Sequence, residues 1–132
     1  MDNHRGAPAF WSYLDILVRD AKVVIDRPKG SHHPRYRDVV YPLDYGYLDG
    51  TTAGDGDGID VWIGANASPT ITAVICTVDK RQRDAEIKVL LGCDEHEEEQ
   101  ILAFHNQSSH QAGILVRRPI ETSDSQAQTP QV

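Results

Sequence analysis

Residues 41–64 read YPLDYGYLDGTTAGDGDGIDVWIG, and this stretch decides how the rest of the chain is interpreted. Up to Asp60 it is dense in aspartate, glycine and proline and has almost no helical periodicity, which predicts irregular structure shaped by the backbone. The run VWIG that follows is apolar and partly β-branched and predicts a strand. The stretch therefore indicates a carboxylate-rich loop that leads directly into a buried strand.

Segments with helix or strand character flank this stretch. Apolar side chains recur at near-helical spacing from Pro8 to Asp20, which predicts an amphipathic helix. Asp94 followed by Glu97 matches a capping box and predicts a second helix that runs through His105. Apolar and β-branched runs predict strands at 21–26, 61–64, 70–78, 86–92 and 113–118.

The order of these segments predicts the fold class. We expect a mainly β protein with peripheral helices: a small five-stranded closed barrel with one helix near each end. The 132 residues suit a single domain, which we assign to residues 1–118. Residues 119–132 are rich in Ser, Gln, Thr and Pro, so we expect a disordered tail there.

Charge and cysteine content narrow the function. The chain has 13 Lys+Arg against 20 Asp+Glu, a net charge of −7, which argues against nucleic acid or an anionic membrane as a partner. No stretch approaches the ~18–20 apolar residues of a membrane span. Cys76 and Cys93 form no CxxC motif and suit reduced core thiols, so we expect a cytoplasmic protein.

The clearest functional signal is the group of aspartates Asp55, Asp57 and Asp60. Like charges this close repel unless a cation neutralises them, and the intervening glycines let the backbone fold tightly. Hard divalent cations bind several oxygen ligands on such a backbone, so the spacing predicts metal binding, with a solvated Asp-Gly turn as the alternative. An EF-hand does not fit, because its sixth position would be Asp60 instead of Gly and its twelfth Asn66 instead of Glu.

A second cluster lies in the predicted strand at 86–92. Glu86 and Lys88 are two residues apart, so their side chains point to the same face of the strand. They form either an exposed charge pair or a carboxylate for a metal beside an ammonium for a phosphate. Lys29 and Arg35, in a loop upstream, would add positive charge.

The string at 41–64 resembles the signature region of the soluble inorganic pyrophosphatases, in which a Tyr-Pro-x-x-Tyr-Gly segment leads into an Asp-x-Asp-x-x-Asp loop and a hydrophobic strand. Upstream, VVIDRPKGS at 23–31 is similar to the family's strand ending in Glu-x-Pro. Downstream, EIKVLL at 86–91 is similar to its Asp-x-Lys strand. The resemblance implies a five-stranded barrel of the oligonucleotide-binding type and Mg²⁺-dependent hydrolysis of a phosphoanhydride, with Mn²⁺ as a substitute ion. We expect pyrophosphate or another small diphosphate as the partner, and a homo-oligomer.

Carried over position by position, the resemblance implies metal ligands and a base. Asp55 and Asp60 would bind the metals that flank the attacking water. Glu86 stands at the position of the family's Asp and would be a third ligand, and Asp26 replaces a Glu near the metal site. Asp57 would hydrogen-bond the bridging water and take its proton.

The resemblance also implies groups that contact the substrate. Lys88 and Arg35 would contact phosphate, and Arg35 stands where the family has Lys. Tyr41 and Tyr45 match the family's two tyrosines, and Tyr45 would orient the carboxylates. We therefore assign substrate binding to Lys29, Arg35, Tyr41 and Lys88, and catalysis to Asp57, Lys88 and Tyr45.

The sequence departs from the family pattern mainly in its phosphate clamp. Residues 37–41 are too few for the family's hairpin, which carries a phosphate-binding Arg. Arg81 and Gln82 stand where the family often has two adjacent acids that recruit a further metal. Phe104 and His105 lie near the position of a missing Tyr-Lys pair.

These departures leave alternatives open. His32 and His33 either replace the missing Arg or are ordinary loop residues. One alternative function is hydrolysis of an organic or nucleoside diphosphate, because the lost clamp leaves space for a leaving group. The other is a catalytically weak module that binds metal or phosphate.

Overall fold

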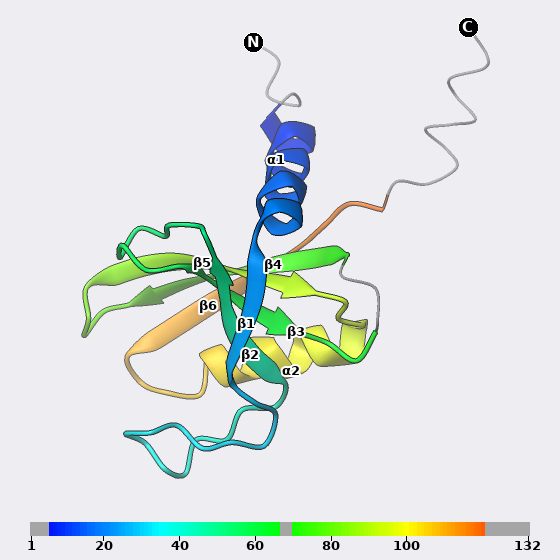
Figure 1. The fold of residues 1–132 in the computed structure, drawn as a ribbon. Helices are drawn as coiled ribbons and strands as arrows, with labels where there is room; N and C mark the ends of the chain where they lie inside the picture. The colour runs from blue at the N-terminus through cyan, green and yellow to red at the C-terminus, as the bar shows by residue number, and fades with distance from the viewer. Residues whose placement is uncertain (1–5, 67–69, 121–132) are drawn as a thin grey trace, which may run out of the picture.

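Two helices and six strands make up the described part of the chain, residues 6–66 and 70–120 of a computed structural model (Figure 1). Neither helix is long and apolar enough to cross a membrane. All but the first two residues of the predicted tail, 119–132, lie outside the described residues. In chain order the elements are α1 (Gly6–Asp20), β1 (Lys22–Arg27), β2 (Asp44–Asp49), β3 (Ile59–Ile63), β4 (Ile71–Asp79), β5 (Asp84–Leu91), α2 (Glu95–His105) and β6 (Gln111–Arg117).

The strands form one mixed sheet in the order β1-β2-β3-β5-β4-β6. Four of the five neighbouring pairs are antiparallel, and β3 and β5 are parallel, with Val61 opposite Val89. The parallel pair is central to the molecule, because it joins the carboxylate loop before β3 to the strand that carries Glu86 and Lys88.

The expected five-stranded closed barrel is wrong. The sheet has six strands and stays open, since β1 and β6 lie at its opposite edges and no pairing joins them among the described residues. The two helices cover the two faces of this open sheet. Trp11 and Leu14 of α1 pack with Val74 and Val89 on one face, and Ile101 of α2 fills the other. Helical side chains thus bury the apolar surface that a closed barrel would bury against its own strands.

The strand that the sequence did not reveal is β2, whose residues DYGYLD were predicted as irregular structure. Its two aspartates and one glycine are residues that strands usually lack. Gly46 is nevertheless required, because a Cβ atom there would lie 1.8 Å from the carbonyl oxygen of Val24 in the neighbouring strand β1. The glycine therefore marks a close approach of two backbones.

The predicted start of α2 is confirmed. The Asp94 side chain accepts the backbone N–H of Glu97, and Glu97 Oε1 accepts the backbone N–H of Asp94. The other oxygen of Glu97 accepts the N–H of Ala65, which follows β3. The capping box thus also fixes α2 to the end of β3, and the helix covers one half of that face of the sheet.

The other half of this face lies beyond α2 and carries polar side chains. Along β3, Trp62 lies beneath α2 in the core, and Asp60, two residues earlier, points to the same face beyond the helix. On β5, Leu90 likewise lies in the core with Ile101, and Lys88, two residues earlier, points to the same face beyond the helix. The fold therefore places the charged residues of β3 and β5 together at the end of the sheet that α2 leaves open.

Candidate active site

Four residues on three neighbouring strands form the centre of the candidate site: Tyr45 on β2, Asp60 on β3, and Glu86 and Lys88 on β5. Tyr45 lies opposite Trp62 in the β2–β3 ladder, so both side chains point to the face that carries Asp60. The parallel β3–β5 pair then brings Lys88 beside Asp60.

Lys88 connects the other three residues. Its Nζ donates to Asp60 Oδ2 and to Glu86 Oε1, both at 2.8 Å, and to the hydroxyl of Tyr45 at 3.0 Å. Tyr45 donates its own hydroxyl proton to Asp60 Oδ2 at 2.7 Å. An ammonium group has three donors, so every donor of Lys88 is in use, and its side chain is only 7% exposed.

The charges at this centre favour a protonated lysine and a neutral tyrosine. Burial opposes the charge of Lys88, but the Tyr45 oxygen, the Asp60 carboxylate and the hydrogen bonds to Asp60 and Glu86 together raise its pKa above the ordinary value. Burial raises the pKa of Tyr45 strongly, and Asp60 adds to this rise while Lys88 opposes it. Lys88 therefore stays a cation and Tyr45 stays a donor at neutral pH.

An acidic pocket lies on one side of Asp60. Its volume is about 360 Å³, and Asp26, Asp57 and Asp60 line it together with Tyr47 and Gly58. Asp26 comes from β1 and Asp57 from the loop before β3, so the pocket gathers carboxylates from three parts of the chain. Such oxygen donors are the ligand type that hard divalent cations take.

Asp55 is outside the group that lines this pocket. Its Oδ1 accepts the backbone N–H of Asp57 at 3.0 Å, and Gly56 between them has a φ of 90°. Positive φ is easily reached only by glycine, so this residue allows the turn. The carboxylate of Asp55 therefore shapes the loop, and its other oxygen remains available to a cation.

The four expected metal ligands, Asp26, Asp55, Asp60 and Glu86, do not converge on one point. Within residues 6–66 and 70–120, no group of three or more His, Cys, Asp or Glu side chains is arranged to hold a metal ion. Asp60 and Glu86 point at Lys88 instead. The four donors thus fit a divalent cation by their chemistry, while in the present arrangement the ammonium of Lys88 neutralises two of them, Asp60 and Glu86.

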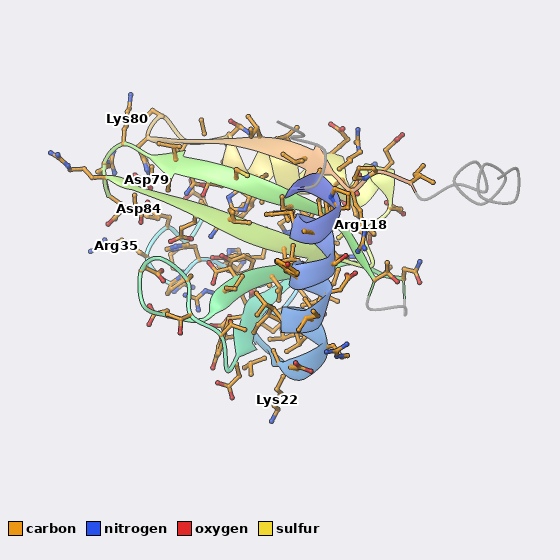
Figure 2. All side chains as sticks on the ribbon, turned by 90° about the horizontal axis from the view of Figure 1, so that it is seen from above. Lys22, Arg35, Asp79, Lys80, Asp84 and Arg118 are labelled. Atoms are coloured by element: carbon orange, nitrogen blue, oxygen red, sulfur yellow. The ribbon has the colours of Figure 1, made fainter. Side chains whose placement is uncertain are left out.

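A cleft of about 310 Å³ lies on the other side of the centre and carries most of the positive charge of the site. Arg35, Arg81 and Lys88 line it, together with a wall of aromatic side chains. Figure 2 shows Arg35 at the same end of the molecule as Asp79, another residue of this cleft, and Arg118 toward the far end. Cations around a cavity of this kind suit phosphate groups.

Tyr41 and Lys29, both expected to bind substrate, occupy different surroundings. Tyr41 lines the cleft but is buried, and its ring packs against Tyr45, Trp62 and Phe104. Lys29 is outside the group that lines the cleft, and its backbone N–H donates to Asp44 Oδ1 at 2.8 Å. Tyr41 therefore supports Tyr45 from behind, and Lys29 holds the loop after β1 against β2.

His32 and His33 both take part in the structure of their loop. His32 Nδ1 lies 2.5 Å from the carbonyl oxygen of Arg37. His33 Nδ1 accepts the backbone N–H groups of Arg35 and Tyr36, and burial with the nearby charges of Arg27 and Arg35 lowers the pKa of His33. Of the two, only His33 is among the residues lining the cleft, so His32 belongs to the loop.

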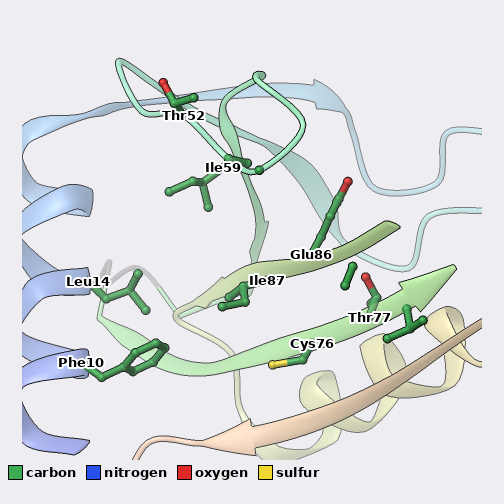
Figure 3. A pocket seen from close by; sticks show the side chains of 12 residues that line it. Phe10, Leu14, Thr52, Ile59, Cys76, Thr77, Glu86 and Ile87 are labelled. Atoms are coloured by element: carbon green, nitrogen blue, oxygen red, sulfur yellow. The ribbon is translucent and has the colours of Figure 1, made fainter. Parts of the chain in front are cut away.

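An apolar hollow of about 430 Å³ lies between α1 and the sheet, and Figure 3 shows Phe10 and Leu14 of α1 facing Ile87 across it. It also contains Cys76, and burial raises the pKa of this thiol. This hollow is larger than the cleft or the acidic pocket, and Glu86 is the one charged residue among the described residues that line it (Figure 3). Its other lining residues are apolar or uncharged, so Glu86 alone connects the hollow to the charged centre.

A cationic cleft lined by Lys88 lies beside an acidic pocket lined by Asp60, and the bond from Lys88 to Asp60 joins the two. This combination is typical of enzymes that work on phosphate groups. The family model described as "Inorganic Pyrophosphatase" matches residues 11–124, which is most of the chain. The chain therefore belongs to the inorganic pyrophosphatase family, and it is an inorganic diphosphatase that hydrolyses pyrophosphate to two phosphates. A comparison with curated proteins gives no match.

The solved structures agree with this family at the level of the fold. An inorganic pyrophosphatase from Neisseria gonorrhoeae is 17% identical, with a TM-score of 0.56 over 82% of this chain and 84% of that one. An inorganic pyrophosphatase from Helicobacter pylori is 15% identical, with a TM-score of 0.48 over 85% of this chain and 90% of that one. At such identities the first match supports a shared fold and no more.

Sequence reasoning missed two pairs around the cleft. Trp62 donates its indole N–H to Nε2 of His105, and Asp79 pairs with Nδ1 of His110 at 3.1 Å. The members of these pairs are 43 and 31 residues apart, so no local pattern could reveal them. A sequence signal exists only for Asp79, which begins the polar turn between β4 and β5.

Proposed function

We propose that the hydrolysis takes place at Asp60, which lines the acidic pocket and bonds Lys88 of the cationic cleft, and that it depends on Mg²⁺, with Mn²⁺ as a substitute. The observation that carries this proposal is the bonding of Lys88 to Asp60, Glu86 and Tyr45. A buried cation that is held by two carboxylates and a tyrosine hydroxyl is a group that can neutralise a phosphate during the reaction.

The carboxylates of Asp26, Asp55, Asp60 and Glu86 would hold the metal. When bound, it lowers the pKa of a water molecule and offsets the charge of the diphosphate. The oxygen donors and the acidic pocket support this assignment, since Lys88 pairs with Asp60 and Glu86, while Asp26 and Asp57 add further negative charge to the pocket. The Asp60 and Glu86 oxygens that now bond Lys88 would become available as the ammonium turns to the substrate.

Asp57 is the base in this proposal. It lines the acidic pocket, its backbone N–H is held by Asp55, and its carboxylate lies in an exposed part of the loop. Such a carboxylate can accept a proton from water in the pocket and pass it to solvent.

The remaining roles in this proposal belong to Lys88, Arg35 and Tyr45. Lys88 and Arg35 line the cleft and would stabilise the charge that develops on the departing phosphate. Tyr45 keeps Asp60 in place through its hydroxyl proton. The oxygen of water bonds to one phosphorus, the bond from that phosphorus to the bridging oxygen breaks, and two phosphates leave.

Phosphate release from pyrophosphate tests the proposal. The protein is first treated with a chelator and then assayed across a Mg²⁺ titration, with the reaction mixture lacking protein as the blank. We expect release only with the metal. Full activity of the chelated protein would contradict the metal dependence, and no release at any Mg²⁺ concentration would favour the binding module over the enzyme.

We also propose that the working form is a homo-oligomer in the cytoplasm. The oligomer is supported by an apolar surface on one face of β4, β5 and β6, where four large side chains are exposed: Val78, Ile87, Ile114 and Val116. The cytoplasmic location is supported by Cys76 and Cys93, which form no disulfide, as is usual in a reducing compartment. A light-scattering mass equal to one chain of 14.7 kDa would contradict the oligomer.

A further inference from the structure

The outer part of the cationic cleft contains groups that two phosphates do not need. The cleft runs from the buried Lys88 to three segments, at residues 33–39, 79–82 and 107–111, whose lining side chains range from the buried Asp79 to the exposed Tyr36. Pyrophosphate consists only of charged oxygens around phosphorus, so it is recognised by cations and N–H donors. The cleft also contains aromatic rings and amide side chains, which suit a ligand that has a planar ring with hydrogen-bonding groups on its edge.

One side of the outer cleft is an ordered aromatic wall. The rings of His33 and Tyr36 lie 5.1 Å apart, and those of His33 and Tyr41 are stacked, with an angle of 7° between their planes. His33 is fixed because its Nδ1 accepts two backbone N–H groups. Tyr36 at the end of this wall is 42% exposed. An exposed ring on a rigid support is a surface on which a planar base can stack.

The outer cleft also has a polar rim that Asp79 holds in place. Asp79 is buried, its Oδ1 accepts the backbone N–H groups of Arg81 and Gln82, and its Oδ2 pairs with His110. Hydrogen bonds to Gln82, His110 and Arg81 also lower the pKa of Asp79, so it remains a carboxylate. One buried group thus ties the 79–82 turn to the 107–111 loop.

The side chains that this rim presents match the edge of a nucleobase. Gln82 and Gln107 line the cleft, and each amide side chain offers both donors and an acceptor. Arg81, beside Gln82, supplies a further positive charge for a phosphate. The cleft therefore combines cations for phosphates, a stacking surface and amides that can bond a base.

From this arrangement we infer that the cleft also accepts a nucleoside diphosphate, with its phosphates toward Lys88 and its base between Tyr36 and Gln82. The inference rests on the proposed function, because the same centre would do the chemistry. Water attacks the terminal phosphorus, and the bond from that phosphorus to the bridging oxygen breaks. The products are a nucleoside monophosphate, which keeps the bridging oxygen, and phosphate, while Asp57 takes the proton from water.

Binding and turnover together test this inference on the full chain. Calorimetry in Mg²⁺ compares the methylene analogue of ADP with methylenediphosphonate, neither of which is hydrolysed at the bridge. The ratio of kcat/KM for ADP to that for pyrophosphate is measured alongside. We expect the ADP analogue to bind more tightly than the small diphosphonate, and ADP to be hydrolysed.

Three variants locate the base. Tyr36→Ala should reduce the affinity for the ADP analogue roughly tenfold and lower the ADP-to-pyrophosphate ratio by a similar factor, because one stacking partner is lost. Tyr36→Phe keeps the ring and should preserve both values. Tyr13→Ala is the matched control, since Tyr13 is an exposed tyrosine on α1 and is outside the group that lines the cleft.

Failure of the inference can be distinguished from failure of the proposed function. If pyrophosphate is hydrolysed but the ADP analogue binds no better than the diphosphonate, or Tyr36→Ala behaves like Tyr13→Ala, the inference is overturned and the proposed function stands. If pyrophosphate is not hydrolysed with Mg²⁺, the proposed catalytic function fails. The binding comparison then still decides whether the cleft recognises a base.

Discussion

Trp62 donates its indole N–H to Nε2 of His105 across 3.0 Å, inside the aromatic core behind the candidate site. An indole N–H can only donate, so Nε2 of His105 must be an acceptor and its proton sits on Nδ1, which faces Gln111 Oε1 at 3.0 Å. His105 is therefore neutral in the folded protein. Because Trp62 packs directly against Tyr45, this neutral pair supports the residue that holds Asp60.

The first prediction is that His105 makes stability depend on pH. Burial lowers its pKa from 6.5 to about 4, and nearby Lys88 adds to this effect while the bond to Gln111 opposes it. The unfolded chain takes up this proton below about pH 6.5 and the folded chain does not until about pH 4. The stabilisation is thus present above pH 6.5 and is lost on acidification, by about 3 kcal/mol in total. Urea unfolding between pH 7 and 4 measures it.

The control for this experiment is His105→Gln, which keeps an acceptor for Trp62 but has no proton to gain. Its free energy of unfolding should change less than that of the wild type between pH 6.5 and 4. If the free energy of unfolding falls equally in the two proteins over this pH range, His105 is not held neutral in the folded protein.

The second prediction concerns metal and stability. A divalent cation that binds the carboxylates of the folded state stabilises it by mass action, by about 2.7 kcal/mol at a concentration 100-fold above Kd. We expect Mg²⁺ to raise the Tm of chelator-treated protein. Asp60→Asn should reduce this rise. A Tm that does not change across the whole titration would contradict a metal site in the folded protein.

The third prediction separates the base from the metal ligand. Asp57→Asn keeps the shape and an acceptor oxygen but removes the base, so turnover should fall by roughly two to four orders of magnitude. Mg²⁺ should still raise the Tm of this variant. If Asp57→Asn keeps near-normal turnover, or loses the Mg²⁺ effect as completely as Asp60→Asn, the assigned roles are wrong.

The fourth prediction concerns Lys88. Lys88→Ala removes the cation that neutralises Asp60 and Glu86, and kcat for pyrophosphate should fall by roughly two to three orders of magnitude. The two carboxylates also lose their partner, so the variant should be less stable without metal. Lys22→Ala on β1 is the control, because Lys22 is exposed at a distance from the site and should leave both values unchanged (Figure 2). Equal activity of the two variants would exclude Lys88 from catalysis.

Features that depend on neighbours in the chain could be predicted from the sequence. The capping box of Asp94 and Glu97 spans four residues, and the strand alternation of Glu86 and Lys88 spans three, so local rules suffice for both. The closed barrel was wrong because closure depends on whether two distant edges meet, and here α1 covers one face through Trp11 and Leu14. The order and composition of the predicted segments do not show that a helix packs on this face in place of further strands.

For the candidate site, too, the local features could be predicted and the long-range contacts could not. Residue type and spacing pointed to Asp60 and Lys88 separately, but their contact follows from the parallel pairing of β3 and β5. The bond between Asp79 and His110 depends on the pairing of β6 with β4, which continues to Asp79 opposite Gln111. Both contacts form only when strands that are distant in the sequence pair with each other. Local sequence patterns therefore could not predict them.

The parallel pairing of β3 with β5 also has a consequence for the order of folding. The bonds from Lys88 to Asp60 and Tyr45 close segments of 28 and 43 residues, and such long-range closure is slow because the chain loses entropy before it gains contacts. The hairpin of β4 and β5 can form earlier, since its strands are neighbours in sequence. During refolding, enzyme activity should therefore return later than the circular-dichroism signal of the strands.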